Sequence, residues 1–171
     1  FADVAFDRSG NVYVAATVSS GATPDIVVLK YSASGALLWA TKPYDGGENG
    51  YDSAVKLAVD TKGDVVVLGR SEHVGGMGIV VLKYKKKSGK PAWAKPTRWV
   101  SPQDSFWAAD LALDGEGDIY VACATSSAAG FSRALIWKAR GSNGHKSGGW
   151  HHVPRHGDSS SFEALTVRGS S

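Results

Sequence analysis

Residues 7–14 read Asp-Arg-Ser-Gly-Asn-Val-Tyr-Val, and the pattern returns as Asp-Thr-Lys-Gly-Asp-Val-Val-Val at 60–67 and as Asp-Gly-Glu-Gly-Asp-Ile-Tyr-Val at 114–121. The copies begin 53 and then 54 residues apart. A regular period of about this length is typical of proteins that repeat one small structural unit along the chain. The sequence therefore predicts three copies of one unit, and the architecture can be inferred from a single copy.

Other features keep the same register in every unit. The segment Val-Val-Leu-Lys-Tyr at 27–31 recurs at 80–84 and, more loosely, as Leu-Ile-Trp-Lys-Ala at 135–139. Each unit then closes on a tryptophan, and an Asp-Ser pair precedes the next unit. We expect a structural role for the first aspartate and the glycine of each repeated turn and for the closing tryptophan: Asp7, Gly10, Trp39, Asp60, Gly63, Trp93, Asp114, Gly117 and Trp150.

Unit two contains four segments with strand patterns. Residues 54–59 are short and β-branched, and 65–68 form an apolar run of the length of a buried strand. A third strand is expected at 79–84. The fourth is expected at 91–97, where prolines and lysines suit an exposed edge that must not pair with other chains. The unit thus has apolar inner strands and a mixed outer strand.

This gradient is expected when four-stranded sheets stand radially around an axis. The predicted fold class is all-β, a β-propeller with three four-stranded blades at about 1–44, 53–99 and 107–153 and one extra strand at 162–167. Because propellers typically close with about 4 to 8 blades, we expect the chain to be part of a larger ring. Further blades of the same chain or a second copy would complete it. The first residue, Phe1, is not methionine, which favours missing residues.

A family resemblance rests on the same residues. The pattern 52–54 (Asp-Ser-Ala), followed by 57–60 (Leu-Ala-Val-Asp) and 63–65 (Gly-Asp-Val), resembles the bacterial seven-bladed β-propeller repeat family. The ending from Gly35 to Trp39 is similar to blade endings of quinoprotein-type propellers, where the tryptophan packs between blades. The resemblance covers essentially the whole chain and implies blade architecture rather than an activity. It also implies an extracellular, cell-surface or periplasmic location, because members are commonly exported.

Composition excludes some classes of partner. Nineteen basic and 16 acidic residues give a net charge of +3, a surplus too small to indicate a nucleic-acid partner. No stretch approaches the roughly 20 apolar residues of a membrane helix, so no membrane insertion is expected. Cys123 is the only cysteine, which excludes an intrachain disulfide. Its place in an apolar strand pattern predicts a buried, unreactive thiol.

Two charged features have a structural and a functional interpretation. The Asp-x-x-Gly turns are explained as tight connections between strands. Calcium is the alternative, but it takes 6 to 8 oxygen ligands and such a turn offers too few. The basic run 83–90 is expected to be a solvated turn between outer strands, with contact to a polyanion as its alternative.

Histidines gather late in the chain, where imidazoles at short spacing are able to hold zinc or another divalent ion. Neighbouring residues of a strand point to opposite faces, and no cysteine or acidic residue stands at an established ligand spacing. No metal site and no cofactor are therefore predicted. The weak metal candidates are His151, His152 and His156.

Residues that differ between units at matched loop positions are better candidates for ligand contact, because all blades share the demands of the scaffold. Loops between blades and loops between second and third strands are expected on one rim. A tryptophan beside arginine and a carboxamide is suited to stack on a sugar or to anchor a protein, whereas packing between blades is its structural alternative. The candidate ligand-binding residues are Arg70, His73, Arg98, Trp99, Gln103 and Trp107.

Motifs for serine hydrolases, zinc proteases and nucleotide binding are missing from the sequence, and no catalytic residue is predicted. The favoured hypothesis is a non-catalytic binding or structural propeller, an interaction scaffold of a cell-surface or extracellular bacterial assembly with a protein or glycan partner. One alternative is a carbohydrate-binding, lectin-like module. The other is the propeller domain of an exported hydrolase or quinoprotein-like enzyme, which would require charged groups at the axis, and none is identified in these units.

Overall fold

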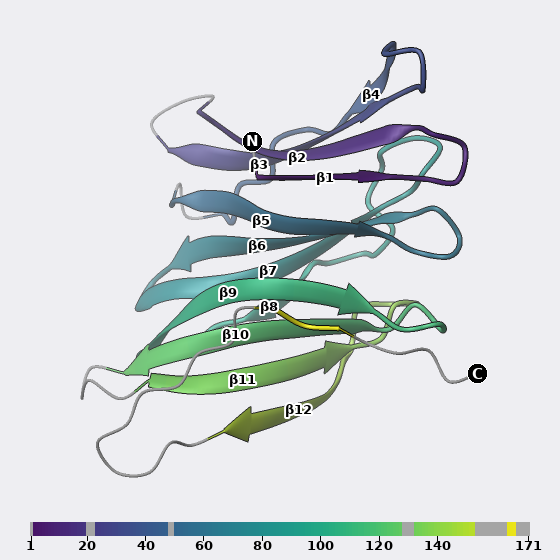
Figure 1. Cartoon of the computed structure of the whole chain (residues 1–171). Coiled ribbons are helices and arrows are strands. Elements are labelled where there is room, and N and C mark those ends of the chain that lie inside the picture. The colour runs from purple at the N-terminus through teal and green to yellow at the C-terminus, as the bar shows by residue number, and fades with distance from the viewer. Residues whose placement is uncertain (1, 20–22, 48–49, 128–131, 153–163, 167–171) are drawn as a thin grey trace.

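The computed structural model describes residues 2–19, 23–47, 50–127, 132–152 and 164–166. Its regular structure consists of strands, which form three four-stranded antiparallel sheets (Figure 1). Each sheet is a meander in which strands that follow one another in sequence are neighbours. The first sheet contains β1 (Asp3–Phe6), β2 (Val12–Ser19), β3 (Pro24–Tyr31) and β4 (Leu37–Ala40). The second contains β5 (Asp52–Val59), β6 (Val65–His73), β7 (Gly76–Tyr84) and β8 (Thr97–Trp99). The third contains β9 (Asp104–Leu113), β10 (Ile119–Ser127), β11 (Ser132–Ala139) and β12 (Lys146–His152).

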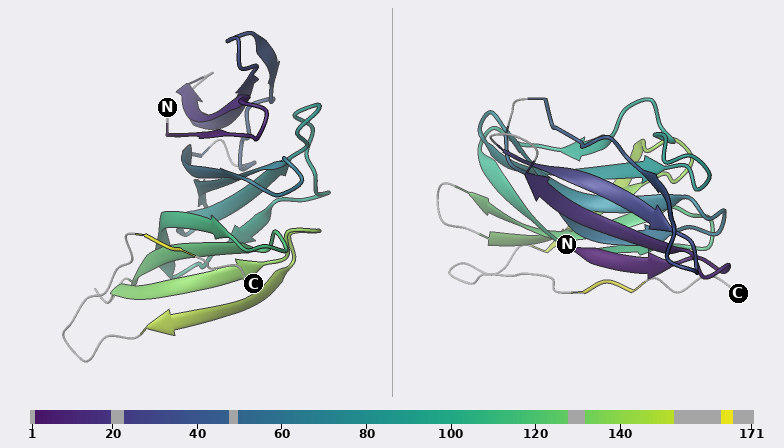
Figure 2. Two further views of the ribbon diagram at one scale, coloured as in Figure 1. Left: turned by 45° about the vertical axis from the view of Figure 1, so that its right-hand side comes forward. Right: turned by 90° about the horizontal axis from the view of Figure 1, so that it is seen from above.

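The three sheets stack face to face, and their first strands lie side by side in the order β1, β5 and β9 (Figure 1). Figure 2 shows the same stack from two other directions, with the three sheets lying over one another in the view from above. Successive sheets with their first strands innermost are the blades of a propeller. The predicted fold class is confirmed, and the sheets correspond to the three units of the repeat. Among the described residues no helix has the length and apolarity to span a membrane.

The apolar strands of blade 2 are explained by its position between two neighbours. Val65, Val67 and Val80 belong to the core shared with blade 1, whereas Val66 and Val81 belong to the core shared with blade 3. Successive residues of a strand point to opposite faces, so a strand with an apolar core on each side needs apolar residues at every position. This is why β6 and β7 contain near-continuous apolar runs.

The repeated turn is held by its first aspartate. Asp7 accepts hydrogen bonds from the backbone N–H groups of Ser9 at 2.9 Å and Asn11 at 3.0 Å, and the other two turns repeat both bonds. Gly10 has a φ of 75°, a conformation that glycine adopts without strain. Burial alone would raise the pKa of Asp7, but the hydrogen bonds from Asn11 and Ser9 and the charge of Lys30 lower it to about 2.

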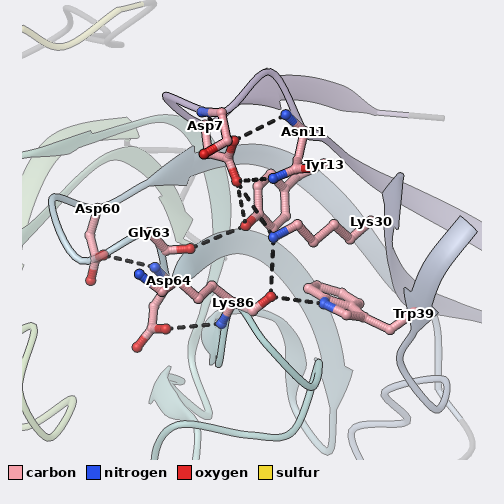
Figure 3. A network of polar contacts seen from close by, with 10 residues as sticks. Asp7, Asn11, Tyr13, Lys30, Trp39, Asp60, Gly63, Asp64 and Lys86 are labelled. Atoms are coloured by element: carbon pink, nitrogen blue, oxygen red, sulfur yellow. Dashed lines mark hydrogen bonds and ion pairs between the residues drawn. The ribbon is translucent and has the colours of Figure 1, made fainter. Parts of the chain in front are cut away.

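The closing tryptophans dock each blade on the next. Trp39 of blade 1 donates from Nε1 to the carbonyl of Lys86 in blade 2 at 3.0 Å (Figure 3). Trp93 of blade 2 makes the equivalent bond to the carbonyl of Gly141 in blade 3 at 3.3 Å. Each indole also packs against a glycine of the same outer turn. A Cβ atom at Gly89 would stand 2.8 Å from Trp39, and one at Gly144 would stand 2.7 Å from Trp93. The repeat therefore encodes the packing between blades as well as the strands within them.

A lysine of the Leu-Lys-Tyr segment completes this contact. Lys30 donates to the same Lys86 carbonyl at 3.2 Å and pairs with Asp7 at 3.5 Å (Figure 3). Lys83 donates to the Gly141 carbonyl at 2.9 Å and pairs with Asp60 at 2.8 Å. In both seams, a tryptophan and a lysine of one blade bind one carbonyl in the outer turn of the next blade. We call this arrangement the seam clamp.

Blade 3 presents its clamp residues differently. Trp150 is 56% exposed and stacks on Tyr120 with ring centroids 6.4 Å apart. Lys138 contacts Asp114 at 3.7 Å and Asp118 at 3.0 Å. These groups belong to the face of blade 3 that points away from blade 2, where the structure describes no further blade.

Two strand predictions differ from the structure. The fourth strand of blade 2 covers 97–99 rather than 91–97, because prolines at 91 and 96 have no N–H to donate to the ladder. The extra strand expected at 162–167 is described only at 164–166, which are not in a regular strand. There the backbone N–H of Leu165 donates to Asp110 at 2.7 Å.

Candidate functional site

The innermost strands β5 and β9 each carry an irregularity at the same place. In β5 the register with β6 shifts between Ala54 and Lys56, and in β9 the register with β10 shifts beside Asp110. A bulge of this kind inserts one residue and re-aims the side chains that follow it. As a result, buried residues stand three apart instead of two, at Ala54 and Leu57 and likewise at positions 108 and 111.

Charged residues stand next to these bulges on the innermost strands. Lys56 follows the bulge in β5, Asp110 follows the bulge in β9, and Asp3 holds the matching position in β1. Each of the three is partly exposed and stands four residues before the aspartate of its turn. The axial row, as we call Asp3, Lys56 and Asp110, therefore places two carboxylates and one ammonium group along three adjacent strands.

Backbone N–H groups hold the two aspartates of the axial row in place. Asp3 accepts a hydrogen bond from the Leu57 N–H at 3.0 Å and lies 4.0 Å from the Lys56 ammonium group. Asp110 makes the equivalent bond to Leu165 and also accepts one from the Leu111 N–H at 2.9 Å. In each aspartate, backbone contacts fix the carboxylate while part of the side chain stays accessible. The sequence analysis identified no charged group at the axis, although the four-residue spacing to each turn was a usable signal.

Trp107 lies on the side of β9 that carries Asp110. It is 47% exposed, and the bulge at position 109 is what places it on one side with Asp110. The guanidinium of Arg70 stands over the indole at 5.6 Å from the ring centroid and donates to the Ala108 carbonyl at 3.2 Å. The structure thus brings together two of the predicted ligand-binding residues, and an aromatic surface remains open beside a carboxylate.

The remaining rim candidates have other contacts. Trp99 is only 6% exposed and stacks on Trp137 at 5.0 Å, so it has no face free for a ligand. Arg98 donates to the Gly46 carbonyl and to a serine hydroxyl inside the seam between blades 1 and 2. His73 is bound to the neighbouring carbonyl at 2.8 Å, and Gln103 is exposed in the loop before β9. Packing, rather than ligand contact, accounts for Trp99 and Arg98.

The histidine candidates are described only in part. His151 and His152 lie in β12, where their backbones pair with Leu135 and Ala134 of β11. Their side chains, and the whole of His156, lie outside the described residues.

An acidic cluster lies at the seam between blades 1 and 2. One carboxylate oxygen from each of Asp25, Asp45 and Asp52 falls within 4.8 Å of the others. Burial raises the pKa of Asp52, although a neighbouring serine hydroxyl and the Gly46 N–H, which donates to it at 2.6 Å, act in the opposite direction. Three monodentate oxygens are half or less of the set that calcium takes. The arrangement is explained by the backbone contact that closes the loop between the blades.

Comparison with known proteins supports the fold. The chain resembles the crystal structure of an endo-arabinase from Bacteroides thetaiotaomicron VPI-5482 with a TM-score of 0.53 and 14% sequence identity. The match covers 85% of this chain and 59% of that one. No protein-family model and no curated protein matches the sequence. The class of protein that the three blades define is thus the β-propeller. The chain spans 59% of the length of the endo-arabinase.

This likeness corrects the favoured functional hypothesis. A non-catalytic interaction scaffold was expected because the sequence carries no known catalytic motif. The structural neighbour is an endo-arabinase, which stands against a non-catalytic scaffold as the favoured hypothesis. The repeat motifs specify blade packing and carry no information on activity, and the charged residues of the axial row belong to no short motif.

Proposed function

We propose that this chain is part of a propeller-type glycoside hydrolase that binds a polysaccharide along the inner strands β1, β5 and β9. The observation that carries the proposal is that adjacent inner strands carry a row of charged residues, Asp3, Lys56 and Asp110, with the exposed Trp107 on the Asp110 side of β9. The fold likeness to an endo-arabinase agrees with it. Binding of a glycan and export from the cell belong to the same proposal, as does completion of the ring by further blades or a second copy.

The chemistry follows from what glycosidic bonds require. Most glycoside hydrolases use two carboxyl groups, one as an acid that protonates the leaving oxygen and one as a base or nucleophile. Asp3 and Asp110 would supply this pair. Lys56 lies on the strand between them, 4.0 Å from Asp3. The exposed indole of Trp107 provides an apolar face on which a sugar ring is able to stack.

Hydrolysis is tested with the chain itself on a panel of arabinan, other neutral polysaccharides and acidic polysaccharides, by release of reducing ends. We expect Asp3→Asn and Asp110→Asn to lower kcat by about 10²-fold to 10⁴-fold, the usual contribution of a general acid or base. Asparagine keeps an oxygen that still accepts the backbone hydrogen bond, so folding is preserved. Glu116→Gln is the matched control, because Glu116 lies in an exposed turn outside the axial row.

Binding separates this proposal from the lectin-like alternative. Trp107→Ala should weaken binding of the cleaved polysaccharide in calorimetry and raise KM with a smaller effect on kcat. If glycans bind and Trp107→Ala removes the binding, but no glycan is cleaved, the chain is a carbohydrate-binding module. Cleavage that survives both asparagine substitutions would refute the assignment of the carboxylates.

A further inference from the structure

A groove of about 820 Å³ opens at the seam between blades 1 and 2, at the end of the inner strands where the Asp-x-x-Gly turns lie. This volume is in the range of small-molecule and oligosaccharide sites. Its lining includes Phe6, which is 64% exposed, and Leu38, which is 51% exposed, together with Trp39. Trp107, near the start of β9, and Arg70, near the end of β6, lie at the strand ends away from these turns, so the groove is distinct from the surface around Trp107.

The polar lining of the groove is strongly basic. The two aspartates that face it are already engaged, Asp7 with its turn and Lys30, and Asp60 with its turn and Lys83. Four other cations line it, and in the part of the chain that the structure describes none of them forms an ion pair: Arg8, Lys62, Lys86 and Lys87. The groove thus presents positive charge that the fold itself does not neutralise.

The scaffold does not require these cations. At the matched seam between blades 2 and 3, the turn residue equivalent to Lys62 is Glu116. The residues equivalent to Lys86 and Lys87 are Gly141 and Ser142. Both seams nevertheless keep the same clamp, with the tryptophan and lysine bonds described above. A feature that one seam has and its structural equal lacks is not required for packing, which makes it a candidate for ligand contact.

We propose that this groove binds an acidic oligosaccharide, one whose sugar rings carry carboxylate groups. The unpaired cations match the carboxylates, and the exposed apolar surface of Phe6 and Leu38 matches the faces of the rings. The inference rests on the proposed function, since it assigns a charged glycan to a second surface of the same propeller. It also gives a functional meaning to the basic run 83–90, which the sequence analysis interpreted as a solvated turn.

The test is calorimetry of the whole chain with a linear oligogalacturonate and with a neutral oligogalactoside of equal length. We expect binding of the acidic sugar only, and loss of affinity as salt is raised, because exposed charge pairs are screened. The double variant Lys62→Glu, Lys87→Ser, which installs the residues of the neighbouring seam, should weaken binding on the order of tenfold. Lys90→Ser is the control, since Lys90 lies in the same turn but outside the groove.

Three results would overturn the inference: equal binding of the neutral sugar, equal effects of Lys87→Ser and Lys90→Ser, or tighter binding of single-stranded nucleic acid or polyphosphate than of the oligogalacturonate. Absence of any binding would also overturn it. The two proposals fail separately, because Asp110→Asn should leave oligogalacturonate binding unchanged. The groove variant, in turn, should leave cleavage of a short neutral substrate unchanged.

Discussion

The seam clamp makes a quantitative prediction about Trp93. Its indole is 8% exposed, packs in the core between blades 2 and 3, and donates a hydrogen bond to the Gly141 carbonyl. Truncation of a buried aromatic residue to alanine typically costs about 3–5 kcal/mol, from lost burial and from the cavity that remains. The hydrogen bond accounts for about 1 kcal/mol of this. We therefore expect Trp93→Ala to lower the free energy of unfolding by about 4 kcal/mol.

Trp150 is the internal control, because it ends the equivalent unit but is 56% exposed. Its main described contact is the stack on Tyr120, and such an aromatic pair contributes about 0.5–1.5 kcal/mol. Trp150→Ala should therefore cost about 1 kcal/mol. A third variant, Trp93→Phe, keeps most of the apolar contact but removes the N–H donor, so its loss should lie between the other two.

Urea unfolding monitored by circular dichroism measures these differences through the transition midpoint, provided that the slope of free energy against urea is the same for each variant. The reasoning fails if Trp93→Ala and Trp150→Ala cost the same. It also fails if Trp93→Phe is as damaging as Trp93→Ala, since burial would then not be the main contribution.

Other predictions concern the turns and the thiol. The pKa of Asp7 is about 2 in the folded chain against 3.8 normally, so its carboxylate stabilises the fold above pH 3.8, and this contribution is lost as the pH falls through 2. In urea titrations across that pH interval, the free energy of unfolding of Asp7→Asn should fall less than that of the unchanged chain. Gly141→Ala should cost about 1–3 kcal/mol because its Cβ would meet the Gly117 carbonyl, whereas Gly115→Ala, with open space around it, should be neutral in thermal melts. Burial raises the pKa of Cys123 to about 12, so a thiol reagent should label it only at the rate of unfolding.

The sequence predicted the blades well because their determinants are local and repeated. The turn aspartates, the positive-φ glycines and the apolar strands recur at fixed offsets, and each of these features fixes backbone conformation within a few residues. The fourth strand of blade 2 was displaced because 91–96 combines edge-strand composition with two prolines, and composition alone does not say where ladder pairing begins.

The candidate site was predicted only in part. Arg70 and Trp107 were expected on one rim and they do meet, because β6 and β9 belong to neighbouring blades and contact each other. Trp99 was expected beside them, but β8 packs it on Trp137. The axial row escaped notice because its members belong to no short motif, and bulges beside two of them interrupt the alternation along β5 and β9. A bulge changes that parity, and its position depends on pairing with the next strand rather than on any residue in it.

The seam clamp also gives the stack a direction. The indole and the ammonium group always come from the earlier blade, and the carbonyl and the glycine always come from the outer turn of the later one. The two ends of the stack are therefore unlike: one presents Trp150 and Lys138, and the other presents Gly35 in a turn with no atom close to it. If two copies associated through the end that presents Trp150 and Lys138, the indole and ammonium donors of one copy would face those of the other. A neighbouring copy would instead bind with its opposite end, head to tail, which is the arrangement of a heterologous interface.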